Sequence, residues 1–234
     1  MRVNKWGVGV VLATAVLLTG CTGGGSDSTT EKKPSAGASQ EAEAPEMDCP
    51  ELKDGASLDG SVLGDCVADA MSETAGYAAT SSVMGIDSTA RVNPSDKAIE
   101  TISPAGSLIV IGDDVWVKSA TSDWQAADPS SSDPVIAALS ASAADASLLD
   151  PTKAADAVTG AFTVTGTGER LGQAVYLLSG TMEQQGTAVE VVFEVTADYV
   201  VLASSSSASL EGQTVEVTME ITEWDVRQEI VAPV

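Results

Sequence analysis

The chain has 234 residues, of which 34 are acidic and 11 basic, so its formal net charge is −23, and it contains no histidine. This composition argues against nucleic acid as a partner, because phosphate binding needs a basic surface, and it excludes histidine-based catalytic triads, general bases and metal ligands. The length and the 44% hydrophobic content allow one domain with a substantial core.

The N-terminus has the order of a secretory signal. Arg2 and Lys5 precede an apolar run over residues 8–18, which is shorter than the about 20 residues of a membrane-spanning helix. The following LTGC segment, which ends at Cys21, resembles the bacterial lipobox. We therefore predict a lipoprotein signal peptide at residues 1–20, cleavage before a diacylglyceryl (palmitate-type) Cys21, and anchoring to the outer face of the cell membrane. The alternative is an ordinary secretory signal with an incidental cysteine.

The next segment is predicted to be a tether. Residues 22–47 are rich in Gly, Ser, Thr, Glu, Ala and Pro and contain almost no large apolar residue, so they cannot bury enough surface to order themselves. A flexible coil of this length would span ~28 Å. We expect the lipidated cysteine and tether at 21–47 and a single folded domain at 48–234.

The two remaining cysteines, Cys49 and Cys66, would face an extracytoplasmic compartment. A pair in that setting is more often a disulfide than a reactive site, and closing this loop would contribute roughly 3 kcal/mol in the entropic model. The alternative is two separate thiols, with Cys66 buried on a helix face.

Within the domain, helical spacing predicts an amphipathic helix over 61–75, capped by Asp59 or Ser61. Period-two patterns then predict strands at 77–86 and 98–103, followed by a hairpin of 108–111 and 115–118 around a Gly-Asp-Asp turn.

Two Asp-Pro pairs, at Asp133 and Asp150, predict the starts of two short helices within 133–158. The rest of the chain indicates β structure, with Ser204 to Ser207 interpreted as a polar strand end or turn. The expected strands are 162–165, 173–182, 188–196, 199–205 and 214–224.

The clearest alternation lies in the strands near residues 190 and 218. Aliphatic side chains occupy every second position there, and mainly Glu or Thr lies between them. This pattern is typical of an antiparallel sheet covered on one side. We therefore predict an α+β fold, a strongly curved antiparallel sheet (a half-barrel) covered on its concave face by a few short helices.

Three stretches resemble the LolA-like superfamily, and more closely its actinobacterial LppX/LprG-type lipoproteins. They are a hairpin, VIGDDVWVKSATSDWQAADP; an insertion helix with the next strands, DPTKAADAVTGAFTVTGTGERLGQAVYLLSGTM; and a C-terminal strand and turn, GQTVEVTMEITEWDVRQEIVAPV. The usual glycine of that last turn is missing, since Asp225 follows Trp224. The resemblance covers residues 58–234.

The resemblance implies an apolar cavity between the half-barrel and its helices that carries a lipid or amphiphile. By strand parity, the candidate lining faces helix residues Val135, Ile136 and Leu139 and consists of Val189, Val191, Phe193, Val195, Val215, Val217, Met219 and Ile221. Inward aliphatic residues also make up any ordinary core, so a packed interior is the alternative. In that case the protein would be a surface lipoprotein acting through protein contacts as a sensor, adaptor or envelope scaffold.

No other residues form a convincing site. The aspartates between 113 and 133 lack EF-hand spacing, and turn aspartates are common. No G-x-S-x-G elbow occurs, and paired carboxylates discriminate nothing in so acidic a chain. We expect no catalytic residues, no metal, no cofactor, no enzymatic activity, and a monomer.

Overall fold

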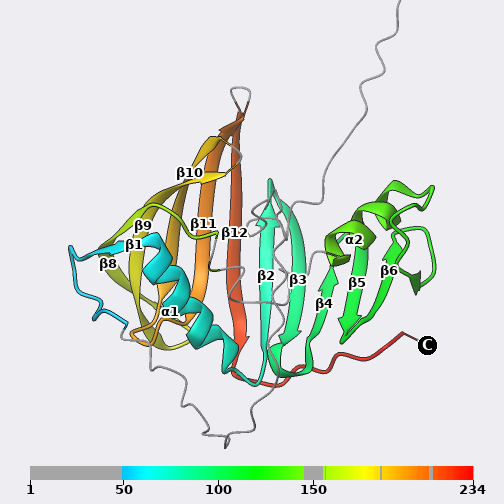
Figure 1. Ribbon diagram of the computed structural model, residues 1–234, viewed down its shortest axis with the longest axis horizontal. Helices are drawn as coiled ribbons and strands as arrows, with labels where there is room; N and C mark the ends of the chain where they lie inside the picture. Colours follow the sequence, from blue (N-terminus) through cyan, green and yellow to red (C-terminus); the bar gives the residue numbers. More distant parts are fainter. Residues whose placement is uncertain (1–48, 145–154, 156, 185, 211–212, 234) are drawn as a thin grey trace, which may run out of the picture.

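The computed structural model describes residues 49–144, 155, 157–184, 186–210 and 213–233. They form a 12-stranded antiparallel open sheet in the order β1-β8-β9-β10-β11-β12-β2-β3-β4-β5-β6-β7, with two α-helices (Figure 1). The predicted α+β half-barrel fold is confirmed. The predicted Cys21, the signal peptide and the tether lie outside the described residues.

Strands that are neighbours along the chain mostly form β-hairpins, and the two α-helices follow β1 and β7. Their bounds are β1 Ser57–Asp59, α1 Gly60–Ser72, β2 Tyr77–Val83, β3 Ile86–Asn93, a short 3-10 helix Pro94–Asp96, β4 Ala98–Ile102, β5 Gly106–Ile111, β6 Asp114–Ser119, β7 Gln125–Ala126, α2 Pro134–Ala144, β8 Ala161–Arg170, β9 Gln173–Gln184, β10 Thr187–Val195, β11 Val201–Leu210 and β12 Gln213–Trp224.

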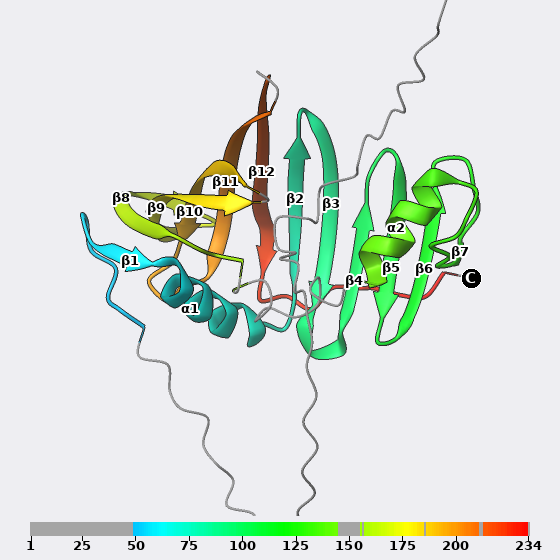
Figure 2. The ribbon, with the colours of Figure 1, turned by 45° about the horizontal axis from the view of Figure 1, so that its top comes forward.

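Both helices lie on the same face of the sheet, which we call the helix face. Cross-strand partners share a face, and the register links Leu178, in the cluster under α1, through Phe193 and Ser204 to Met219. A second row runs on this face from the strands under α2 to β12: Val117, Leu108, Thr101, Ala90, Ala79 and Ile221. In Figures 1 and 2, α1 lies over one end of the sheet and α2 over the other.

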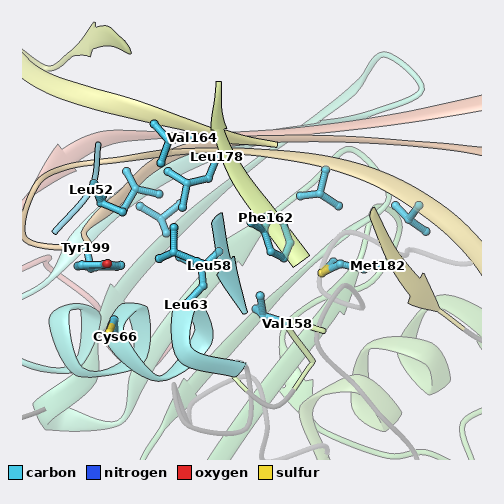
Figure 3. Packing of buried hydrophobic residues seen from close by; sticks show 14 residues of the cluster. Leu52, Leu58, Leu63, Cys66, Val158, Phe162, Val164, Leu178, Met182 and Tyr199 are labelled. Carbon is cyan, nitrogen blue, oxygen red and sulfur yellow. The ribbon is translucent and has the colours of Figure 1, made fainter. Parts of the chain in front are cut away.

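The α1 end contains the largest core cluster (Figure 3). The Asp59 side chain caps the helix by accepting from the amide of Ser61 at 3.0 Å, as one of the two predicted caps would. Leu63 and Cys66 of α1 are buried against the sheet around Phe162, which is fully buried. Gly180 makes room for that ring, because a Cβ there would lie 2.6 Å from Phe162 Cδ1.

The structure joins Cys49 to Cys66 in a disulfide, with their Cα atoms 5.9 Å apart. The bond ties the first described residues to α1. Nearby, the hydroxyl of Tyr199 donates to the carbonyl of Pro50, so the segment before β1 is attached at a second point. These two links hold the N-terminal side of the domain against the cluster under α1.

The α2 end has a separate core. The carboxylate of Asp133 accepts from the amides of Val135 and Ile136 at 2.9 and 3.4 Å, so the predicted cap is present. Ile136 and Leu139 are buried against strands β5 and β6. Gly106 of β5 permits this close approach, since a Cβ there would lie 2.9 Å from Leu139 Cδ1.

The C-terminal segment crosses the opposite face, which we call the polar face. The side-chain amide of Asn93 donates to the backbone carbonyl of Gln228, and the backbone amide of Gln228 donates to the side-chain oxygen of Asn93. At the turn before this segment, Asp225 adopts a left-handed backbone with φ of 57°. Its carboxylate accepts from the amide of Ala75 at 2.9 Å, so aspartate occupies the position where the resembled family has glycine.

The single predicted strand at 77–86 was wrong. The chain turns at Met84 and Gly85, with φ of 51° and 80°, and Ile86 begins β3. Two consecutive positive φ values are typical of a type I′ hairpin turn, which usually carries Asn-Gly. Because Met84 stands in the place of the asparagine, the sequence did not indicate a turn.

The interpretation of the serine run 204–207 as a strand end or turn was also wrong. These serines lie inside β11 and pair with β10 on one side and β12 on the other. The predicted helix that begins at Asp150 falls largely outside the described residues.

Candidate functional site

The predicted cavity-lining residues of β10 belong to the α1 cluster. Val189, Val191 and Val195 are buried there, and Phe193 packs against it with its ring 5.5 Å from that of Phe162. These side chains are therefore packed core in the described structure.

The predicted helix side of the lining lies elsewhere. Ile136 and Leu139 are buried in the α2 cluster and Val135 packs against it, together with Leu108 and Val117. The structure thus does not bring the α2 residues against β10 and β12, because α2 packs on β5 and β6. The expectation that these two sets face each other is corrected: they share a face of the sheet but stand at different places on it.

The β12 residues lie mostly outside these two groups, although Met219 packs against the α1 cluster. Ile221 is buried in a third cluster with Ala79 and Leu202. Val215, Val217 and Met219 are only half-buried, although they point to the same face. Figure 2 shows the two helices on either side of β12, over the two ends of the sheet.

Small residues flank most of this row on the neighbouring strands, although Val83 of β2 pairs with Val217. Ser206 pairs with Val217 on one side, and Ser204 and Ser81 flank Met219. The sheet between the two helices therefore presents apolar side chains of β12 beside short side chains that cannot cover them. We call Val215, Val217 and Met219, with their flanking residues of β11 and β2, the central strip.

A groove lies on the polar face, behind the central strip. It has a volume of about 850 Å³, and most of its lining belongs to the polar face, including Thr80, Ser82 and Thr218, although Ser81 and Met219 also border it. Because Thr218 alternates with Met219, these hydroxyls point away from the helices. The sequence predicts that this face is acidic and solvated. It does not predict a groove, because the shape of the groove depends on how strands far apart in the sequence are arranged in the sheet.

One ion-pair network borders the groove. The guanidinium of Arg170 donates two hydrogen bonds to the Glu194 carboxylate, at 2.6 and 2.9 Å, and lies 3.7 Å from Glu220. The hydrogen bond and the charge of Glu194 raise the pKa of Arg170 further above its usual value. A side chain from the end of β8 is thereby fixed over β10 and β12.

The described residues contain no group of three or more His, Cys, Asp or Glu side chains placed to hold a metal ion. No helix among them is long and apolar enough to cross a bilayer.

The sequence matches no protein-family model and no curated protein. The structure is similar to that of the Mycobacterium tuberculosis lipoprotein LppX, with 13% identity, a TM-score of 0.52, and coverage of 74% of this chain and 98% of LppX. It is also similar to LprF from Mycobacterium bovis, with 10% identity, a TM-score of 0.51, and coverage of 74% of this chain and 96% of LprF. These similarities show that the chain shares the fold of LppX and LprF.

Proposed function

We propose that the chain is a membrane-anchored extracytoplasmic lipoprotein that binds or carries a lipid or other amphiphile on the helix face. The observation that carries the proposal is the half-buried aliphatic row Val215, Val217 and Met219, between two ends of the sheet that are packed under helices. The shared fold with LppX, itself described as a lipoprotein, supports this assignment.

The physical chemistry of the central strip suits an acyl chain. Each methylene group moved from water to an apolar surface contributes about 0.8 kcal/mol, so a ligand with a long chain gains several kcal/mol without any directional contact. The serines of β11 and β2 leave space beside the β12 row, and their hydroxyls can hydrogen bond to the polar end of an amphiphile. No covalent chemistry is required.

Anchoring follows from the predicted lipid on Cys21. A single chain gives weak membrane binding, whereas two or more chains hold a protein stably at the bilayer. Radiolabelled palmitate fed to the host should be incorporated into the chain and lost in Cys21→Ser. A chain that stays unlabelled in both forms would contradict the anchor.

Ligand binding is tested by titrating the chain with a dansyl-labelled fatty acid. We expect saturable binding that Val217→Gln weakens at least about tenfold, because a polar amide then lies in the path of the acyl chain. Val231→Gln is the matched control, since Val231 is 63% exposed and lies in the C-terminal segment, outside the strands. Unfolding in urea confirms that both variants fold.

Equal binding by Val217→Gln and the parent chain would remove the central strip as the site. Absence of any uptake would instead favour a surface lipoprotein that acts through protein contacts.

A further inference from the structure

Most residues that line the groove point to the polar face, away from the proposed amphiphile site, although Ser81, Ser204 and Met219 border both. Its volume of about 850 Å³ falls within the range of pockets that hold small ligands. Since its lining comes from strands that are paired on both sides, the groove is built on the rigid part of the fold.

The floor of the groove is a sheet of hydroxyl groups. Thr218 on β12 lies between Ser82 on β2 and Ser205 on β11, and Thr80 lies one step along β2 on the same face. Among the described residues, Ser81 and Ser88 bond to each other on the helix face at 2.8 Å, but no side-chain hydrogen bond engages these four floor hydroxyls. Each can therefore donate and accept toward a ligand.

The wall at the β8 end supplies fixed charges of both signs. Glu194 holds Arg170 in a two-point contact, and the Arg170 side chain remains 40% exposed. Glu220, also in the lining, is 56% exposed and 3.7 Å from the guanidinium. With Asp87 on the rim, three carboxylates face one guanidinium, which disfavours an anionic ligand.

The wall at the β4 end is apolar. Ile102, which is 45% exposed, and Pro104 both line the groove there. Their hydrocarbon surfaces lie at the edge of a floor that otherwise offers hydroxyl and carboxylate groups. The groove thus combines many uncharged hydrogen-bonding groups, paired charges and a small apolar patch.

The geometry points to a neutral, polyhydroxylated ligand, a short oligosaccharide segment, as the occupant of this groove. Sugar hydroxyls act as donors and acceptors at once, which complements the hydroxyl floor and the Glu220 and Arg170 wall. The C–H face of a sugar ring complements Ile102 and Pro104. The ligand carries no charge, so it avoids repulsion from the carboxylates.

The test is calorimetric titration of the full chain, in a detergent whose headgroup contains no sugar, with maltohexaose, a linear mannotetraose and chitotetraose. At least one should bind with a Kd of about 1 mM or tighter, with little dependence on salt concentration. The double variant Thr80→Val and Thr218→Val keeps the strand-forming shape and should weaken that binding about tenfold. Thr214→Val is the matched control, on the same strand and face but outside the groove lining, and should bind like the parent.

Three outcomes would overturn the inference. The first is no binding of any of the three sugars at concentrations up to about 10 mM. The second is unchanged binding by the double variant. The third is binding of tetralysine alone, lost at high salt, which would assign the groove to a cationic partner. The result can be distinguished from failure of the amphiphile site, because Val217 does not line the groove, so Val217→Gln should leave sugar binding intact.

Discussion

Strands β10 and β12 carry the same alternation of aliphatic and polar residues but differ in burial. On β10, Val189, Val191 and Val195 are buried in the α1 cluster. On β12, two strands away on the same face, Val215 and Val217 are only half-buried.

The difference shows that alternation determines the face of the sheet, whereas burial depends on what lies above the strand. On β10 the cover comes from α1 and the residues around Phe162. In the β12 row, Met219 packs against the α1 cluster, but the partners of the row on β11 are the small residues Ala208, Ser206 and Ser204. Among the described residues, Val215 and Val217 are therefore less covered than the valines of β10.

Removing the disulfide should produce the largest loss of stability. The bond lies at the α1 end of the sheet, where the valines of β10 are buried. The double variant Cys49→Ala and Cys66→Ala should lower the free energy of unfolding by about 3 kcal/mol, because an open loop has more conformational freedom in the unfolded state. Equilibrium urea unfolding of the oxidised parent and the variant measures the loss. Equal stability would show that the bond does not constrain the chain.

Truncating one valine on each strand tests whether the side chains of β10 are more deeply buried than those of β12. Val191→Ala should lower the free energy of unfolding by about 2 kcal/mol, since it empties a buried position. Val217→Ala should lower it by less than about 1 kcal/mol, because the side chain is already half-buried. Urea unfolding of both variants under the same conditions provides the measurement. A larger loss for Val217→Ala would mean that the β12 row is ordinary core.

The cap of α2 should have a smaller, pH-dependent effect. The Ser119 hydroxyl and the amide of Val135 stabilise the Asp133 carboxylate and hold its pKa below the usual value. A lowered folded-state pKa contributes stability above the unfolded pKa of about 3.9 and loses it as the pH falls through the folded value. Asp133→Ala should therefore lower the thermal midpoint of unfolding at neutral pH. The difference in midpoint between the variant and the parent chain should become smaller in acid.

Asp123→Ala serves as the control for that variant, because Asp123 is exposed and caps no helix. Fatty-acid binding by Asp133→Ala should match the parent, since α2 packs away from the central strip. Loss of binding without unfolding would show that α2 contributes to the site.

The ion pair on the polar face should have the smallest effect. Arg170 links Glu194 of β10 to Glu220 of β12, but its side chain is 40% exposed, so solvent screens the pair. A double-mutant cycle of Arg170→Gln and Glu194→Gln should give a coupling free energy of about 0.5 kcal/mol, measured by urea unfolding. A coupling of several kcal/mol would show that this pair, and not only the hydrogen-bonded ladder, holds the strands together.

Local sequence signals predicted much of the fold. Asp133 and its proline marked the start of α2, and the alternating valines marked β10 and β12. Local rules failed where the residue type was unusual, as at Met84 in the turn between β2 and β3. They also failed at the serines of β11, because pairing on both sides offset their weak strand preference.

The site was predictable only in part. Strand parity correctly assigned Val217 and Met219 to the helix face, but it cannot tell which strands a helix covers. Helix α2 packs on β5 and β6, and Arg170 of β8 reaches Glu194 of β10. Both contacts depend on long-range packing, which no local sequence pattern indicates. The polar groove could not be found from sequence for the same reason.

The most direct test of amphiphile binding is native mass spectrometry of residues 48–234, exported into the envelope of its own host and purified without detergent. We expect an added mass that organic solvent releases and that behaves as a lipid, and a lower occupancy in Val217→Gln than in Val231→Gln. A bare protein mass, together with no uptake of labelled fatty acid or phospholipid, would contradict amphiphile binding.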